Sequence, residues 1–363
     1  MLFEPLSRGL LQTRNRLVMS PMTRNRAVAA NTPNALMAEY YAQRAGAGLI
    51  ITEGTSPSPN GLGYPRIPGL FNDAHVRGWK AVTEAVHARG GRIFVQLMHT
   101  GRVTHIANLP AGAEVVSPTA EICPGEMYTD AQGLQPYSPP RPMTEQDIAH
   151  AVEEYAQSAR LAIQAGFDGI ELHAANGYLI EQFLNANVNK RTDAYGGSIA
   201  GRNRFALEVV RATVAAIGAE RVGIRLSPGG VFNSTGAFPE LEPQYLALVG
   251  ELSKLGLAYV HVLDHSAMGA PPVPDELKLK LRQAFAGVFI LAGGFDAASA
   301  ERALIERRAD LIAFGRPYLA NPDLVERLRL NAKLNTPDQS TFYVPGPKGY
   351  TDYPTLAAQA VTS

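Results

Sequence analysis

The sequence predicts an α/β fold, a parallel (β/α)8 TIM barrel, and three observations support this prediction. Eight short apolar runs bounded by Gly, Pro or Asn alternate with longer amphipathic stretches. Eight such units close most naturally into a barrel. The competing open, doubly wound sheet is disfavoured because no G-x-G-x-x-G follows the first run and eight units exceed its usual number.

Each expected element follows from its own residues. The strand-like runs are short and apolar, and they occupy residues 17–21, 48–54, 92–99, 169–174, 222–228, 259–264, 288–294 and 311–317. Helix-like segments lie between them and include residues 35–45, 75–90, 145–166, 202–218 and 297–308. Several of these segments end in a glycine, which suits the C-terminus of a helix.

Two segments exceed what a minimal barrel needs. Residues 100–143, after the third strand, are rich in Pro, Gly and Ser, and they lie where such barrels carry an active-site lid. Residues 331–363 contain the aromatic stretch "TFYVPGPKGYTDYP" and are expected to pack back on the barrel as a C-terminal tail. No repeat or second domain is visible, so residues 1–363 are predicted to form a single domain.

Composition narrows the class of ligand and the compartment. Lys and Arg total 33, as do Asp and Glu, so no global charge attracts nucleic acid or anionic lipid. The hydrophobic fraction of 46% permits a large core. The single cysteine, Cys123, and an N-terminus unlike a signal peptide favour a cytoplasmic protein, and no metal site is predicted.

Polar side chains gather where the predicted strands end, on the face where such barrels carry their active sites. The third strand presents Gln96 and Met98, the fourth Glu171 and His173, and the fifth Arg225. A buried arginine needs a partner, which is either Glu171 in an internal ion pair or the electron-rich edge of a ligand. Gln96 and His173 favour a flat ligand edged with hydrogen-bond donors and acceptors.

The last two strands end in "AGGF" and "FGRPYLANPDL", which suit an anion. Glycine lets backbone N–H groups approach phosphate closely, and an arginine adds a bidentate cation. The candidates are Gly293, Gly294, Gly315 and Arg316. Alternatively, the glycines serve tight turns and Asn321 caps the next helix. A phosphate beside a flat polar-edged site indicates a phosphorylated planar cofactor. FMN is favoured over pyridoxal phosphate because no strand end carries a lysine.

A third cluster lies in "GIELHAANGYLIEQFLN", residues 169–185, where a strand becomes a helix. His173, Asn176 and Tyr178 either cap and pack this junction or converge on a ligand above the strand. With this motif, the sequence resembles the Old Yellow Enzyme family of FMN-dependent ene-reductases, in its bacterial N-ethylmaleimide reductase and glycerol trinitrate reductase-like branch. The resemblance covers essentially the whole chain, and H-x-x-N-G-Y together with R-T-D-x-Y-G-G-S is highly specific.

The resemblance implies an N-terminal hairpin before the barrel and a role for each flavin-site residue. Pro21, Met22 and Thr23 would lie along the flavin, with the Thr23 hydroxyl near ring oxygen O4, and Gly54 would approach the ring through its backbone. Gln96 and Arg225 would hold the pyrimidine edge. The phosphate would be held by Gly294, Gly315 and Arg316, in agreement with the reasoning from the residues alone.

The resemblance also implies the chemistry. NADPH or NADH would reduce FMN, leave, and be replaced in a ping-pong cycle by an enone, a maleimide, a nitroalkene or a nitrate ester. His173 and Asn176 would bind the activating oxygen, Tyr178 would donate the proton, and Tyr343 would line the substrate pocket. The alternatives are a flavin-binding regulatory or storage protein and a phosphosugar-type lyase or isomerase. The family pattern leaves monomer and homodimer open.

One position departs from the family pattern. Relatives usually carry tryptophan where this chain has Met98, and a flexible thioether would enlarge and soften the wall of the substrate pocket. We therefore expect an altered substrate orientation, unless Met98 is plain core filler. Asn176, where some relatives have histidine, keeps a hydrogen-bond donor without a titrating group.

Overall fold

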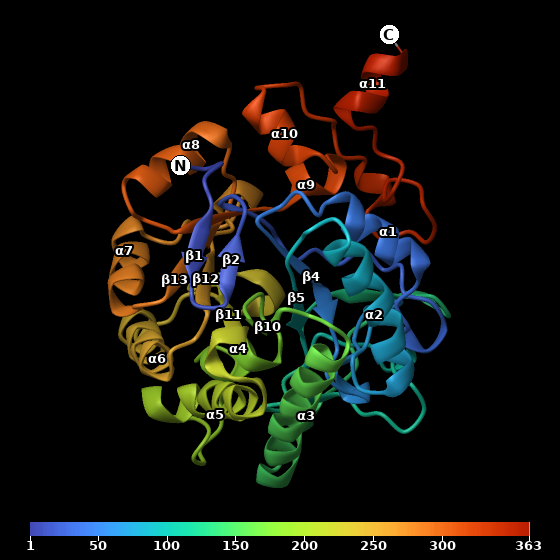
Figure 1. Cartoon of the computed structure of the whole chain (residues 1–363). Coiled ribbons are helices and arrows are strands. Elements are labelled where there is room, and N and C mark those ends of the chain that lie inside the picture. Colours follow the sequence, from blue (N-terminus) through green and yellow to red (C-terminus); the bar gives the residue numbers. More distant parts are fainter. Residues whose placement is uncertain (363) are drawn as a thin grey trace.

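The computed structural model describes residues 1–362, which form a closed barrel of parallel strands with helices packed around it (Figure 1). The predicted TIM barrel is confirmed. Neighbouring strands run in the order β10-β11-β12-β13-β14-β3-β4-β5. Their bounds are β3 (Leu17–Met19), β4 (Leu49–Thr55), β5 (Ile93–Leu97), β10 (Gly169–Ala174), β11 (Val222–Leu226), β12 (Tyr259–Leu263), β13 (Val288–Ala292) and β14 (Leu311–Phe314).

Helices connect the strands and cover the outside of the barrel. The longer ones are α1 (Ala35–Gln43), α2 (Asp73–His87), α3 (Glu145–Gln164), α5 (Ile199–Ile217), α6 (Leu241–Leu255), α7 (Asp275–Ala284) and α8 (Ala297–Ile305). The shorter ones are α4 (Leu179–Leu184), α9 (Arg316–Ala320), α10 (Leu324–Arg329) and α11 (Leu356–Thr362). Local signals set their ends: a capping box of Thr144 and Asp147 starts α3, and left-handed Gly256 ends α6. No described helix is long and apolar enough to cross a membrane.

Several strands are shorter than predicted, and two of them, β3 and β14, end where the cavity begins. The run 17–21 leaves the sheet after Met19, and Pro21 has no backbone N–H to donate to the ladder. The run 311–317 leaves it after Phe314, because Gly315 turns the chain and α9 starts at Arg316. The residues released from the ladder are free to line a ligand site.

An N-terminal hairpin closes the opposite end of the barrel. It consists of β1 (Leu6–Arg8) and β2 (Leu11–Thr13), which pair antiparallel. Leu6 and Leu11 are buried and pack in one cluster with barrel residues that include Val18 and Phe94. Burying apolar side chains there seals the end of the barrel away from the cavity.

The insertion after the third barrel strand contains two small sheets. Strands β7 (Glu126–Thr129) and β8 (Gly133–Pro136) form an antiparallel hairpin, and β6 (Val116–Ser117) pairs with β9 (Arg141–Pro142). The expected long insertion after this strand is confirmed. Its role as an active-site lid stays a prediction.

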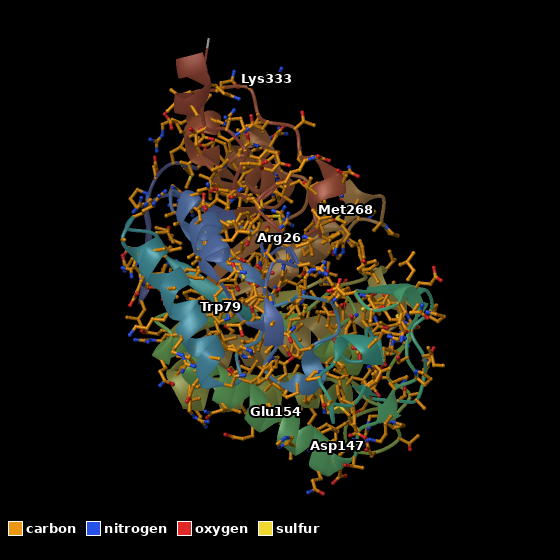
Figure 2. The ribbon with its side chains drawn as sticks, turned by 90° about the vertical axis from the view of Figure 1, so that its right-hand side faces the viewer. Arg26, Trp79, Asp147, Glu154, Met268 and Lys333 are labelled. Carbon is orange, nitrogen blue, oxygen red and sulfur yellow. The ribbon has the colours of Figure 1, made fainter. Side chains whose placement is uncertain are left out.

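Buried arginines bind the tail to the segment that follows β3. Arg26 donates from Nη1 to the carbonyl of Phe342 at 2.7 Å and from Nη2 to that of Thr341 at 2.8 Å. Arg24 donates from Nη2 to the carbonyl of Gly349 at 2.7 Å. Figure 2 labels Arg26 in the middle of the molecule. Because these arginines follow residues 21–23 directly, one stretch of chain anchors the tail and lines the cavity.

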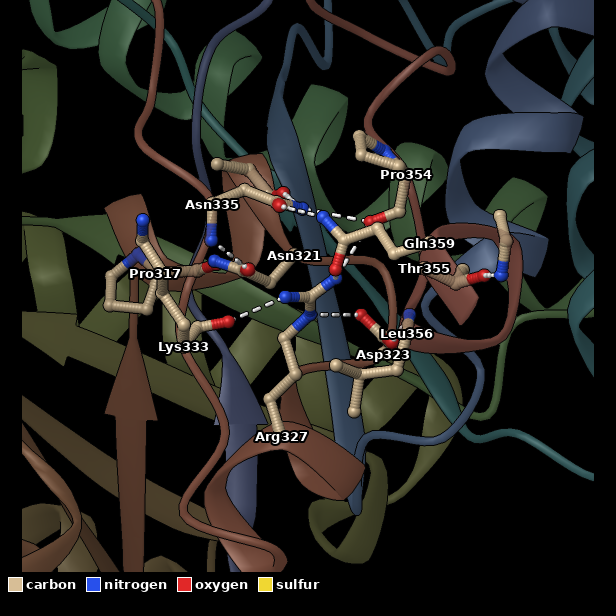
Figure 3. Close-up of polar contacts among 12 residues, drawn as sticks. Pro317, Asn321, Asp323, Arg327, Lys333, Asn335, Pro354, Thr355, Leu356 and Gln359 are labelled. Atoms are coloured by element: carbon tan, nitrogen blue, oxygen red, sulfur yellow. Dashed lines mark hydrogen bonds and ion pairs between the residues drawn. The ribbon is translucent and has the colours of Figure 1, made fainter. Parts of the chain in front are cut away.

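A further buried arginine, Arg327, binds the tail near α10. Arg327 is buried and donates to Asp323 Oδ1 at 2.7 Å, to the carbonyl of Lys333 at 2.6 Å and to that of Pro354 at 2.8 Å (Figure 3). Ser363, the last residue of the predicted tail, lies outside the described residues.

Candidate functional site

A cavity of about 800 Å³ opens at the C-terminal ends of the barrel strands. Every residue that the sequence analysis selected for the cofactor and substrate sites lines it: Pro21, Met22, Thr23, Gly54, Gln96, Met98, His173, Asn176, Tyr178, Arg225, Gly293, Gly294, Gly315, Arg316 and Tyr343. Segments far apart in the sequence therefore meet in one site, which the barrel topology makes possible.

A tight turn after β10 carries the central cluster. Asn176 and Gly177 both have left-handed backbones, with φ of 60° and 75°. A Cβ at Gly177 would lie 2.7 Å from the carbonyl oxygen of Phe232, so only glycine fits there. The turn brings the ring of Tyr178 edge-on to that of His173, with centroids 4.9 Å apart. Both side chains line the same cavity.

His173 presents a neutral donor. The side chain is buried, and burial lowers its pKa well below the ordinary value, with the charge of Arg225 acting in the same direction. The backbone N–H of Ala175 donates to Nδ1 at 3.3 Å. The neutral ring therefore carries its proton on Nε2, which is the nitrogen left to donate to a ligand.

Asn176 is held through its backbone, which leaves its side chain unused. Its N–H donates to Ser227 Oγ at 2.9 Å, and its carbonyl accepts from Asn233 Nδ2 at 2.7 Å. Its buried side-chain Oδ1 has no hydrogen-bond partner among the described residues. The alternative that Asn176 caps the next helix is wrong, because Tyr178 occupies the N-cap position of α4.

Tyr178 is a phenol kept protonated by its surroundings. Burial raises its pKa to about 12, and the bond with Tyr64 acts in the opposite direction. The hydroxyl oxygens of Tyr64 and Tyr178 are 3.0 Å apart. Tyr64 lies in the loop after β4, where no sequence signal marked it.

Glu181 stabilises the turn through hydrogen bonds, and the sequence did not predict it as a site residue. Its Oε2 accepts from the N–H of Gly177 at 2.7 Å and from Ser227 Oγ at 3.0 Å. Burial raises its pKa to about 7. The available signal was a charged residue four positions after Gly177, within the largely apolar run at residues 179–184.

The contacts of Glu171 exclude one of the two partners considered for Arg225. Glu171 forms no ion pair with Arg225 in the described part of the chain; it accepts from Gln96 Nε2 at 2.8 Å and from His261 Nδ1 at 2.8 Å. The register explains this, because Arg225 lies opposite His173 on the neighbouring strand, while Glu171 lies opposite Gly223. Arg225 Nε is buried and has no hydrogen-bond partner among the described residues, as expected for a group that binds a ligand.

The ends of β13 and β14 form the other side of the cavity. Gly293 and Gly294 have φ of 135° and 69°, and a Cβ on Gly294 would lie 2.5 Å from the Cβ of Ala267. Arg316 is exposed and has no ion pair within residues 1–362. Asn321 does not cap the following helix: it ends α9 and accepts from the N–H of Asn335 at 2.7 Å.

These features fit FMN. The unpartnered Nε of Arg225 suits the electron-rich edge of a planar ring. The guanidinium of Arg316 lines the same cavity as the close-packed Gly293 and Gly294, which suits a phosphate. The cavity volume of about 800 Å³ is in the upper part of the range for cofactor and ligand sites, as a cofactor of the size of FMN requires.

Comparisons with known proteins agree with this geometry. The NADH:flavin oxidoreductase / NADH oxidase family matches residues 1–335. The 12-oxophytodienoate reductase 7 of Oryza sativa subsp. japonica is 42% identical over 98% of this chain and 94% of its own. Morphinone reductase in complex with tetrahydroNAD has a TM-score of 0.92 at 46% identity, covering 98% of this chain and 97% of that chain. The Old Yellow Enzyme homologue from Zymomonas mobilis has a TM-score of 0.94 at 39% identity, covering 98% and 99%.

Proposed function

The chain belongs to the Old Yellow Enzyme family of FMN-dependent NAD(P)H oxidoreductases, and we propose that it reduces the activated C=C bond of α,β-unsaturated carbonyl and nitro compounds. One observation carries this proposal. Two hydrogen-bond donors, His173 and Asn176, and one partly buried phenol, Tyr178, converge on a cavity suited to FMN.

The donors act on the substrate oxygen. An activated alkene accepts a hydride at its β carbon only when its oxygen is polarised, because negative charge then builds on that oxygen. His173 Nε2–H and the Asn176 amide stabilise this charge. Tyr178 gives its proton to the α carbon from the other side of the substrate. FMN, when bound, contributes reversible two-electron chemistry that links NAD(P)H oxidation to alkene reduction.

The cofactor would be held at three places. Gln96 and Arg225 would bind the pyrimidine edge, and Arg316 would bind the phosphate together with the backbone around Gly293, Gly294 and Gly315. Residues 21–23 and Gly54 would hold the ring, to which the Thr23 hydroxyl would offer a hydrogen bond. That residues 1–363 work as one FMN-binding domain, with residues 100–143 as its lid, is part of the same proposal.

A single cavity serves both halves of the cycle in this proposal. The chain has no separate dinucleotide-binding motif, and a similar enzyme has been solved with a nicotinamide derivative. Coenzyme and alkene would therefore occupy the cavity in turn. Initial rates measured over both substrates should give parallel double-reciprocal lines, whereas intersecting lines would contradict a shared site.

The colour of the protein separates the alternatives. A barrel lyase that works through a lysine Schiff base is disfavoured because no described lysine lines the cavity. The purified protein should be yellow, with one FMN per chain, and should bleach when NADPH or NADH is added without oxygen. A colourless protein that neither retains nor binds FMN would contradict the proposal.

The pH dependence of alkene reduction follows from Tyr178. A proton donor works in its protonated form, and a pKa raised to about 12 keeps Tyr178 protonated through mild alkali. The single-turnover rate should therefore be constant from about pH 8 to about pH 11, above the range where Glu181 titrates. pH-jump stopped-flow measures it, and a half-loss at about pH 10, the ordinary pKa of a phenol, would contradict the assignment.

Met98 is predicted to set the stereochemical outcome. It is buried, lines the cavity and packs so closely on Gly54 that a Cβ there would lie 2.5 Å from its Sδ. An indole at this position must extend into the cavity. Met98→Trp should therefore change the enantiomer ratio of products from bulky cyclic enones, while Met98→Leu, of similar size, should keep it. If Met98→Trp gave unchanged enantiomer ratios across several enones, Met98 would only fill the core and would not orient the substrate.

A further inference from the structure

Behind the residues that line the cavity lies a buried carboxylate that the proposed chemistry does not use. Glu171 lies on β10 and is fully buried. Gln96 Nε2, from β5 on one side, donates to its Oε1 at 2.8 Å. His261 Nδ1, from β12 on the other side, donates to its Oε2 at 2.8 Å. The carboxylate therefore joins Gln96, which lines the cavity, to His261, which is buried behind it.

Gly223 makes the reach across β11 possible. It lies opposite Glu171 in the register, and a Cβ on it would overlap the ring of Tyr259. The missing side chain lets groups from β12 approach the carboxylate. Burial raises the pKa of Tyr259 well above its usual value, and the negative charge of Glu171 raises it further. Burial lowers the pKa of His261, so its ring is neutral and donates from Nδ1.

The bond to Glu171 fixes the direction of the Gln96 amide. An amide has one donor end and one acceptor end, and a carboxylate accepts only from the donor end. The acceptor Oε1 of Gln96 is therefore the end left for the cavity. The pyrimidine ring of FMN carries an N–H between two carbonyl oxygens, so an acceptor held in this direction complements it.

Glu171 also acts on the cation beside it. Arg225 is buried; burial lowers its pKa, and the negative charge of Glu171 raises it. No ion pair joins the two side chains in the described structure, so Glu171 acts through its field while Arg225 Nε stays unpartnered. A fixed negative charge near the pyrimidine edge disfavours added electrons and offsets part of what Arg225 contributes.

We infer that Glu171 is a positioning residue of the FMN site, which directs the Gln96 amide toward the cofactor and keeps the reduction potential of bound FMN low by offsetting Arg225. The inference rests on the proposed binding of FMN in this cavity. It adds a function for a residue that touches neither cofactor nor substrate in this account.

The direct test measures the FMN midpoint potential in Glu171→Gln, a substitution of almost equal size that removes the charge. The equilibrium constant for two-electron reduction should rise about tenfold, which is about 30 mV upward. Glu53→Gln is the matched control, since Glu53 is also buried, lies on β4 and accepts from the Tyr41 hydroxyl at 3.0 Å outside the cavity. Its constant should stay within about twofold of the parent. An unchanged or lowered potential in Glu171→Gln would overturn the inference.

If Glu171→Gln does not fold, Glu171→Asp provides a second test of the inference. This variant keeps the charge but shortens the reach to Gln96, so the potential should stay near that of the parent while the Kd for FMN rises about tenfold. In nitrogen-15 NMR of labelled FMN, the ring N–H signal should shift as its acceptor is lost. Parent-like affinity and an unshifted signal would overturn the inference. A parent protein that binds no FMN would instead defeat the proposed function.

Discussion

Replacing Tyr178 with phenylalanine should lower the rate of alkene reduction by about 10²-fold or more, because the variant lacks the proton donor. Tyr178 is the residue whose hydroxyl both lines the cavity and lies in the turn with His173 and Asn176. Reduction of the flavin by NADPH or NADH should stay within about threefold of the parent, since that half of the cycle needs no proton on the alkene. Anaerobic stopped-flow resolves the two halves.

Tyr64→Phe is the matched control for this prediction. It removes the neighbouring hydroxyl, 3.0 Å away, and leaves the proposed donor in place. Its rate of alkene reduction should fall by less than about tenfold, because only one bond to the donor is lost. If Tyr64→Phe lost as much activity as Tyr178→Phe, or if Tyr178→Phe kept the parent rate, the roles assigned to the two phenols would be wrong.

Asn176→Asp should also cost about 10²-fold or more in alkene reduction. The substitution preserves size, and aspartate tolerates the left-handed backbone that the turn requires. It replaces the amide donor with a carboxylate that repels the charge developing on the substrate oxygen. The loss should appear in single-turnover reoxidation by 2-cyclohexenone, with FMN content unchanged.

Asn176→His tests whether a donor is what this position supplies. Histidine offers an N–H and also tolerates the left-handed backbone better than most residues. We expect it to retain activity within about tenfold of the parent. A histidine variant as slow as the aspartate variant would mean that the turn tolerates only asparagine and that the donor argument fails.

The barrel was predictable because its signals are local. Each strand is a short apolar run bounded by turn residues, and the helices carry their own caps, so the pattern fixes the order of elements. The strand ends were less predictable. Gly315 and Arg316 read as part of the last strand, but they leave it to line the cavity, and this depends on what the neighbouring loops leave open.

The site was predictable where the residue type states its chemistry, as with His173 and Tyr178. The contacts that position these residues were not predictable, because they depend on the register of the strands and on which side chains reach across a neighbouring strand. Glu171 was expected to meet Arg225 or leave it to a ligand, whereas it binds Gln96 and a histidine two strands away, over Gly223. A sequence does not state that a glycine on one strand opens a path between its neighbours.

The most direct test of the central claim is reoxidation of the reduced protein by an activated alkene. The protein is reduced with NADPH or NADH without oxygen and mixed with 2-cyclohexenone in a stopped-flow instrument. We predict that the flavin absorbance returns within a catalytic turnover and that one cyclohexanone forms for each FMN. Flavin that stays reduced until oxygen is admitted would contradict the account and leave the protein a binder of FMN.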